Sequence, residues 1–308
     1  MTTNAIQSSH IYSTYFAPRG RSRIYTLGMQ IAQLYLSPFD QIIGFIGEAG
    51  SGKSVLIKGM FPGIELTNDD DGVNVRPLPL LEQEYETGFF TPHTYHLDIR
   101  FETGFHQLSE LADAVRLAVR RGKRIIIEHF DLIYPLLGVN ANLLIGVGEQ
   151  IVITRPNLFG PLPQDLCEIV YPSLAYRLMA HSAEDLCENA MTQEQMLACS
   201  HGDIRHGFVL EFNEHQPDID IPTLEARVNE LIRADLPIDY YDESHILLGG
   251  VQHYCTGPRT HVRSTGRIIG FRLLDHFIYD HFHKTYMLVG CVGDDSEENI
   301  RKLEKIHG

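Results

Sequence analysis

The sequence has no tryptophan, few cysteines and no long hydrophobic segment. No apolar run approaches the roughly 20 residues that a membrane-spanning helix needs, so we expect no membrane partner. The five cysteines are an odd and scattered set, which argues against a disulfide framework and favours a reducing cytoplasm. The first ten residues lack a basic patch followed by an apolar stretch, so the sequence indicates no signal peptide.

Positive charge is also scarce, because 25 Lys and Arg stand against 40 Asp and Glu, for a net charge of −15. The imbalance is concentrated in residues 181–308, which hold 11 basic and 22 acidic residues, compared with 14 and 18 in residues 1–180. Such an acidic C-terminal half argues against broad, non-specific binding of nucleic acid, although it leaves room for a local basic groove.

The clearest functional motif lies in residues 41–54. A short apolar run at residues 42–46 is typical of a buried strand. Residues 47–54 then match G-x-x-x-x-G-K-S, in which glycines let the backbone N–H groups point at phosphate oxygens. We expect Lys53 to be a solvent-facing contact of the β- and γ-phosphates, and the Ser54 hydroxyl to ligate Mg²⁺. The helix that follows favours an anion at its N-terminus. The sequence therefore predicts a phosphate loop with the contacting residues Gly47, Gly50, Ser51, Gly52, Lys53, Ser54 and Val55.

An acidic turn follows the helix of the phosphate loop. We expect a strand at residues 63–67 that ends in an Asp-rich turn. Ligands in open α/β sheets sit beyond the carboxyl ends of strands, so this turn is a candidate base for a substrate hydroxyl or a ligand of Mg²⁺. A solvated Asx-rich turn is an equally compatible interpretation. The carboxylates concerned are Asp69, Asp70 and Asp71.

A second nucleotide-site signal lies at residues 123–131. The apolar strand at residues 125–127 ends in the carboxylate Glu128, and Asp131 is the second candidate. A carboxylate at this place beside a phosphate loop holds the water shell of Mg²⁺ or orients a water molecule. We therefore expect Glu128 to serve catalysis and magnesium binding.

The order of the remaining elements predicts an α/β domain at residues 1–170 with a mainly parallel sheet and flanking helices. A Pro-rich break at residues 155–163 places the domain boundary near residue 170, which gives a second domain at residues 171–308. The elements expected besides those above are an irregular segment at 1–20, helices at 22–36 and 108–121, strands at 96–101 and 149–154, and an extended loop, a candidate lid, at 76–96.

These motifs resemble those of the P-loop kinase and NTPase class. The acidic turn is similar to that of the uridine-kinase-like branch, which uses an Asp there as a base. The sequence contains no Asn-Lys-x-Asp stretch, so the guanine-reading motif of small GTPases is missing and ATP is favoured. The resemblance implies ATP and Mg²⁺ as ligands, although no lid arginine motif is evident.

The second half carries a different set of blocks. A helical stretch begins at residue 171, a Phe-containing strand follows at 205–212, and a long helix at 221–238 is ended by Pro237. A cysteine and the segment Thr-His-Val-Arg-Ser-Thr-Gly-Arg-Ile at residues 260–268 come last. In order and spacing, these blocks resemble the α+β second additional domain of alanyl-tRNA synthetases, which also occurs in freestanding trans-editing proteins, over roughly residues 178–292.

The resemblance implies a zinc site and an ester-hydrolysing pocket for mischarged tRNA. Carried over, His181 is the first helix ligand, and Cys255 and His261 are the later pair. The second helix histidine of the family is replaced here by Asp185, and Cys255 and His261 are six residues apart where the family has four. A carboxylate can ligate zinc, so His181, Asp185, Cys255 and His261 are the candidate Zn²⁺ ligands. The alternatives are ordinary histidines with a buried apolar cysteine, and an empty pocket.

Three functions fit the sequence. The first is a metal-dependent hydrolase of aminoacyl-tRNA or another aminoacyl ester, gated by a nucleotide. The second is a P-loop kinase for a small metabolite, in which the editing-like domain recognises an amino acid derivative. The third is a nucleotide-gated binding protein without turnover. The sequence does not indicate the oligomeric state.

Overall fold

A computed structural model of the chain describes residues 12–67, 93–213 and 215–307. The chain divides into two compact units, the first formed by residues up to 17 together with 21–172, and the second by residues 18–20 together with 173–308. Within the described ranges, no helix combines the length and the apolar character that crossing a membrane requires.

The first unit is built on a six-stranded sheet with the order β1-β6-β5-β2-β4-β3. Strands β2 to β5 are mutually parallel, β6 is antiparallel to β5, and β1 is antiparallel to β6. The sheet is therefore mixed, and the expectation of a mainly parallel sheet misses the reversal of β6. The strands are β1 (Ser13–Phe16), β2 (Ile42–Ile46), β3 (Thr94–Asp98), β4 (Arg124–Glu128), β5 (Leu143–Val147) and β6 (Gln150–Thr154).

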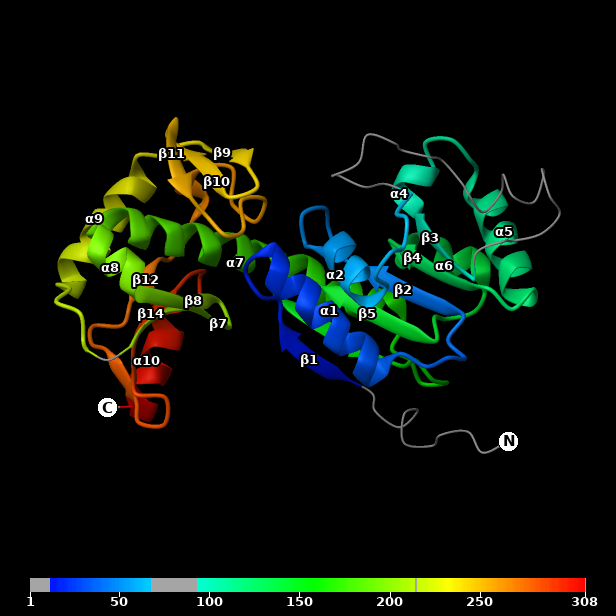
Figure 1. The fold of residues 1–308 in the computed structure, drawn as a ribbon, viewed down its shortest axis with the longest axis horizontal. Coiled ribbons are helices and arrows are strands. Elements are labelled where there is room, and N and C mark those ends of the chain that lie inside the picture. The colour runs from blue at the N-terminus through cyan, green and yellow to red at the C-terminus, as the bar shows by residue number, and fades with distance from the viewer. Residues whose placement is uncertain (1–11, 68–92, 214, 308) are drawn as a thin grey trace. The chain divides into compact units, whose positions relative to one another are not determined.

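Helices cover both faces of this sheet (Figure 1). The central strands are apolar throughout because successive side chains enter two different cores. Ile43 and Phe45 pack with α1 and α2, whereas Ile42 and Ile46 pack with α5, α6 and the start of α7. The helices are α1 (Arg21–Tyr35), α2 (Lys53–Met60), α4 (Ile99–Glu102), α5 (Leu108–Arg120), α6 (Phe130–Leu137) and α7 (Pro163–Ala190).

Three expected elements of the first unit are corrected. The segment expected to be irregular contains β1. Residues 63–67 form no strand, because the Thr67 N–H donates to the imidazole of His96 (3.1 Å) and the Asp98 N–H to the Thr67 hydroxyl (3.1 Å), so side chains replace a backbone ladder. The strand expected at 96–101 ends at Asp98, whose side chain caps α4. The expected lid at 76–96 lies mostly outside the described residues.

The second unit contains two antiparallel sheets and the C-terminal part of α7. One sheet has the order β12-β14-β8-β7, with β13 also paired to β14, and the other the order β11-β10-β9. Side chains of α7 and α9 pack with β8 and β14 in one apolar core. The elements are α8 (Gln193–Ala198), β7 (Cys199–Ile204), β8 (Gly207–Asn213), α9 (Ile221–Arg233), β9 (Ile238–Asp242), β10 (His245–Leu248), β11 (Val251–Tyr254), β12 (Arg272–Leu273), β13 (Ile278–Asp280), β14 (Thr285–Cys291) and α10 (Ser296–His307).

Two helix boundaries differ from expectation in this half. Helix α7 begins at Pro163 rather than near 171, because a proline is tolerated in the first turn of a helix. Helix α9 ends at Arg233, before Pro237, since Asp235 takes a left-handed conformation (φ 48°) that the helix cannot continue.

Candidate functional sites

The glycine-rich segment between β2 and α2 is a tight turn that favours glycine at several positions. Gly50 and Gly52 have φ values of 80° and 91°, which a residue with a side chain rarely adopts. At Gly47 a Cβ atom would lie 2.5 Å from the carbonyl oxygen of Val147. Helix α2 begins directly after Gly52, so its N-terminal N–H groups belong to the same turn.

Lys53 lies inside this turn rather than facing solvent, which corrects the expectation. Its side chain is 5% exposed, and Nζ donates to the carbonyl oxygens of Gly47 and Glu48, both at 2.9 Å. The ammonium also lies 3.7 Å from the Glu128 carboxylate. Burial lowers the pKa of Lys53, and the charge of Glu128 opposes that shift. The amine is thus held at the loop by carbonyl groups that a phosphate can replace as its partners.

Glu128 meets the glycine-rich turn because β4 is the direct neighbour of β2. In the parallel register Glu128 lies opposite Phe45. Phe45 is two residues before Gly47, the first glycine of the turn. The Ser54 hydroxyl donates to Glu128 (3.3 Å), and the imidazole Nε2 of His96 lies 3.1 Å from the same carboxylate oxygen. Burial acts to raise the pKa of Glu128, but the hydrogen bond with His96 and nearby positive charge hold it below its usual value. The carboxylate is therefore ionised beside the serine expected to ligate Mg²⁺.

Two residues that the sequence interpretation did not select complete this group. Asp98 ends β3 and lies opposite Glu128 in the register, and His129 follows Glu128. Ligand atoms of Asp98, Glu128 and His129 all lie within 4.8 Å of one another, and the three residues are buried. Burial and the charge of Lys53 lower the pKa of His129 to about 4, so its ring is neutral and able to accept a metal ion. Asp98 could have been found by the rule that selected Glu128, because it too ends a strand of the sheet.

The other predicted carboxylates of the first unit have different outcomes. Asp131 accepts a hydrogen bond from the Tyr171 hydroxyl (3.3 Å) and is absent from the group around Glu128. Asp69, Asp70 and Asp71 lie outside the described residues. Arg100, which was not predicted, forms a two-point pair with Glu48 of the glycine-rich turn at 2.9 and 3.3 Å. A positively charged side chain therefore contacts this turn, although the sequence contains no recognisable lid arginine motif.

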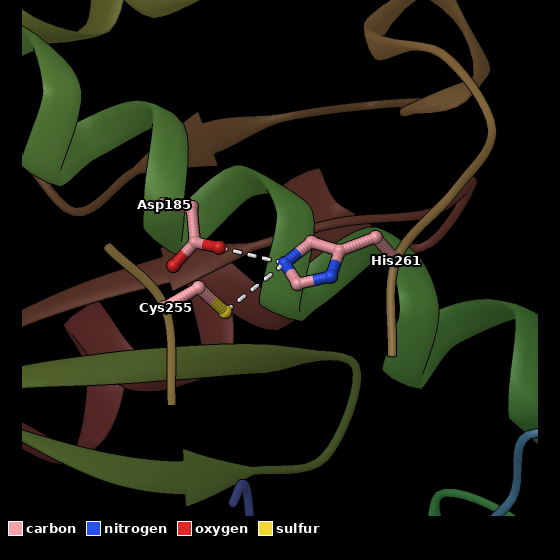
Figure 2. A group of neighbouring side chains, drawn as sticks. All are labelled: Asp185, Cys255 and His261. Carbon is pink, nitrogen blue, oxygen red and sulfur yellow. Dashed lines mark hydrogen bonds and ion pairs between the residues drawn. The ribbon is translucent and has the colours of Figure 1, made fainter. Parts of the chain in front are cut away.

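A second group lies in the C-terminal unit, where Asp185 of α7 meets Cys255 and His261 (Figure 2). Cys255 follows β11 directly, and His261 lies in the loop after it. The imidazole Nε2 is 2.6 Å from Asp185 Oδ2 and 3.7 Å from Cys255 Sγ. The side chains of Asp185 and His261 are 2% and 4% exposed, respectively, and Cys255 is buried. Three of the four predicted zinc ligands are thus brought together.

The fourth predicted ligand, His181, is not part of this group. Its imidazole Nε2 instead lies 3.9 Å from the carboxylate of Asp203 on β7. His181 and Asp185 share α7 as predicted, but only Asp185 contributes to the convergence. Burial, aided by the positive charge of Arg177, lowers the pKa of His181 well below its usual value. A spacing of four on a helix was therefore insufficient to identify both ligands.

The arrangement around His261 differs from a catalytic triad. In a triad the nucleophile and the acid face different ring nitrogens, whereas here Asp185 and Cys255 both face Nε2. Nδ1 lies 3.4 Å from the carbonyl oxygen of Pro258, which can only accept a hydrogen bond. A neutral ring that donates from Nδ1 directs the lone pair of Nε2 at the Asp185 oxygen. Burial and the charge of Arg19 lower the pKa of His261 to about 3, so a second ring proton is disfavoured.

A bound metal cation suits this donor set. It would satisfy the imidazole nitrogen and the carboxylate oxygen together, and carboxylate, thiolate and imidazole are the ligand types of Zn²⁺. The Gly257 N–H donates to Cys255 Sγ (3.2 Å), and the Pro258 carbonyl orients the imidazole, as outer-shell groups of metal sites do. The residues present therefore fit zinc with three protein ligands, a number typical of catalytic rather than structural zinc sites.

Arg19 is the residue of this site that sequence reasoning missed altogether. Its guanidinium is 3% exposed and donates to the carboxylates of Glu184 and Asp185 and to Cys255 Sγ (3.3 Å). Residues 18–20 belong to the second unit, although the residues on either side belong to the first. Burial disfavours the charged guanidinium, but the surrounding carboxylates, Glu184 first, more than compensate and raise the pKa of Arg19. No local pattern could reveal this partner, because 165 or more residues separate it from the groups that it contacts.

Comparison with known proteins adds no assignment, because the chain matches no protein-family model and no curated protein.

Proposed function

We propose that the first unit binds a nucleoside triphosphate, with ATP as the expected nucleotide, and transfers or hydrolyses its γ-phosphate. The observation that carries this proposal is the meeting of Lys53, Ser54 and Glu128 at a glycine-rich turn that opens a helix. A buried amine, a hydroxyl and an ionised carboxylate are the groups that phosphate and Mg²⁺ require at such a turn.

Each residue has a defined task in this proposal. Lys53 exchanges its two carbonyl partners for phosphate oxygens, and the turn supplies N–H donors. Ser54 and Glu128 would hold Mg²⁺, which neutralises the charge of the phosphates when bound. Asp98, one strand from Glu128, is the described carboxylate best placed to accept a proton from an attacking hydroxyl or water. Transfer to a small molecule would make the first unit a kinase, whereas transfer to water would make it a nucleotide-dependent gate.

The Glu128→Gln variant is expected to retain ATP binding and to lower the turnover rate by about 100-fold or more. The amide keeps the size of the side chain but loses the charge that acts beside Ser54. Phosphate release assayed at saturating Mg-ATP measures the rate, and calorimetry measures the affinity. Asp131→Asn is the matched control, because Asp131 pairs with Tyr171 and should be dispensable. A wild-type rate in Glu128→Gln together with a slow Asp131→Asn would transfer the catalytic role to Asp131.

We further propose that the second unit hydrolyses an aminoacyl ester, such as a mischarged tRNA, at Asp185, Cys255 and His261. The specific observation in favour is that the ligand atoms of the three residues lie within 4.8 Å of one another. The Asp185 carboxylate and the Cys255 sulfur both face Nε2 of His261. Zinc held there would supply Lewis-acid polarisation or an activated water. The three residues bind and orient that ion, while Arg19 balances the carboxylates around it. Nucleotide binding to the first unit gates this activity in the proposal.

Zinc analysis tests this second proposal. We expect about one zinc per chain to be lost in Cys255→Ser and in Asp185→Asn, because each variant removes a ligand. His181→Ala should keep this zinc, since His181 stands outside the group. Occupancy should fall as the pH falls, because the Cys255 thiol must lose its proton to bind metal, whereas the His261 imidazole is already neutral. Wild-type protein that is purified without chelator and lacks zinc at neutral pH would contradict the proposed hydrolysis.

A further inference from the structure

A second cluster of metal-ligand types lies farther along α7. It consists of Glu188 on α7 and of Cys199 and His201 on β7, and their ligand atoms all lie within 4.8 Å of one another. The imidazole Nε2 of His201 contacts the Glu188 carboxylate. None of the three residues belongs to the group at His261.

The fold directs these side chains to one place. Residues two apart on a strand share a face, so Cys199, His201 and Asp203 point to the same side of β7. They lie opposite Phe212, Leu210 and Phe208 on β8, and residues directly opposite in an antiparallel pair also share a face. Those three apolar residues pack in one core with α7 side chains. The Cys199 and His201 side chains therefore stand on the sheet face that α7 covers.

Helix α7 presents a matching polar row to that face. His181, Asp185 and Glu188 are spaced by four and three residues, which places them on one side of the helix. His181 pairs with Asp203 and Glu188 with His201, so the polar side chains of the helix lie against those of β7. The paired residues lie on a helix and on a strand, and such elements hold ligands more firmly than loops do.

Buried carboxylates gather on α7 beside this row. Three carboxylates within one and a half turns of α7 are nearly fully buried, namely Glu184, Asp185 and Glu188. The Arg19 guanidinium donates to the first two, whereas Glu188 contacts the imidazole of His201. Burying a carboxylate is costly unless a cation or several donors compensate it. A divalent cation at Glu188 would supply that compensation.

The space between the two clusters is also lined with ligand types. Asp185, Glu188 and His253 have ligand atoms within 4.8 Å of one another, so they bridge the two groups. The Nε2 atom of His253 is buried and has no hydrogen-bond partner among the described residues. A buried ring nitrogen without a partner is unusual in a folded protein. It is explained if this nitrogen faces an ion or an ion-bound water.

We propose that Glu188, Cys199 and His201 bind a second divalent metal ion, adjacent to the group of Asp185, Cys255 and His261. One carboxylate, one thiolate and one imidazole form a set of intermediate softness, which favours Zn²⁺ over Mg²⁺ or Ca²⁺. Binding releases the thiol proton of Cys199, which in the metal-free protein is donated to the carbonyl oxygen of Met196 (3.2 Å). The second unit would then hold two metal ions along one helix.

The test is the zinc content of the full chain, purified without chelator and dialysed against Zn²⁺ and then buffer. Cys199→Ser and His201→Ala are each expected to lose about one zinc relative to wild type, because three protein ligands are reduced to two. His201→Cys should restore the lost zinc, since a thiolate replaces the imidazole. His276→Ala is the matched control, because His276 is exposed and lies outside every such group in the described residues.

Cobalt substitution separates the two sites. In Co²⁺-loaded protein, Cys199→Ser should remove one part of the thiolate-to-metal absorption, and Cys255→Ser a different part. Loss of metal only in Cys255→Ser would support the site at His261 and overturn this second one. Loss only in Cys199→Ser would support the second site while the proposed hydrolytic site fails. Zinc content and cobalt spectra unchanged in folded Cys199→Ser and His201→Ala proteins would overturn the inference.

Discussion

The Lys53→Ala variant is expected to lose ATP affinity by about 100-fold or more. Lys53 is the buried cation of the glycine-rich turn, and in the proposed function its amine would exchange the carbonyl oxygens of Gly47 and Glu48 for phosphate oxygens. Hydrogen bonds to charged groups contribute about 1.5–3 kcal/mol each, and a change of 1.4 kcal/mol alters an affinity tenfold. Calorimetric titration with Mg-ATP measures the loss directly.

The same substitution should also lower the free energy of unfolding of the first unit. Lys53 is buried, and the ammonium lies 3.7 Å from Glu128, so alanine leaves that carboxylate without its nearest amine. His96 still contacts Glu128, which keeps the effect smaller than a complete loss of partners. Lys58→Ala on the same helix is the control, because it removes a lysine away from the turn. Unchanged ATP affinity in a folded Lys53→Ala protein would contradict the phosphate-loop interpretation.

The Arg19→Ala variant is expected to destabilise the second unit by about 3–5 kcal/mol, which is the usual cost of breaking a buried ion pair from one side. The substitution leaves the buried carboxylates of Glu184 and Asp185 without their shared guanidinium, and Cys255 without one of its donors. The free energy of unfolding can be measured by urea denaturation monitored by far-UV circular dichroism. Arg263→Ala is the matched control, because Arg263 is an exposed arginine of the same unit.

Zinc links this second prediction to the proposed metal sites. An ion that binds only the folded state stabilises it, and a cation beside Asp185 replaces part of the charge that Arg19 supplied. Added Zn²⁺ should therefore restore part of the stability of Arg19→Ala, but not in the Arg19→Ala, Cys255→Ser double variant. An Arg19→Ala protein as stable as wild type without added metal would show that the observed contacts of Arg19 contribute little.

The proposed nucleotide site could be predicted largely from local sequence because its parts follow from short-range rules. An apolar run, a glycine-rich turn and a helix occur consecutively at residues 42–60, as expected. Glu128 was recognisable as the acid that ends an apolar strand. Asp98 obeys the same rule, but its strand is less apolar and continues directly into α4, which obscured its end.

The proposed metal site of the second unit was only partly predictable. Asp185, Cys255 and His261 were found by resemblance, and they do converge. His181 was selected by the same resemblance, yet it meets Asp203 instead, because a helix face is broad enough for two residues four apart to meet different partners. Cys199 and His201 carried no recognised signal, because β7 was not expected as a strand.

The amino-acid sequence by itself determined the strand, glycine-rich turn and helix at residues 42–60, most of the α/β elements around them and the acidic character of the second half. These depend on residue types that are close together in the chain. The tertiary structure alone decided that β6 runs antiparallel, that Lys53 is buried beside Glu128, and that Arg19 lies among Glu184, Asp185 and Cys255. The physical reason is that strand order and buried charge pairing are settled by contacts between distant segments, which no local pattern of side chains encodes.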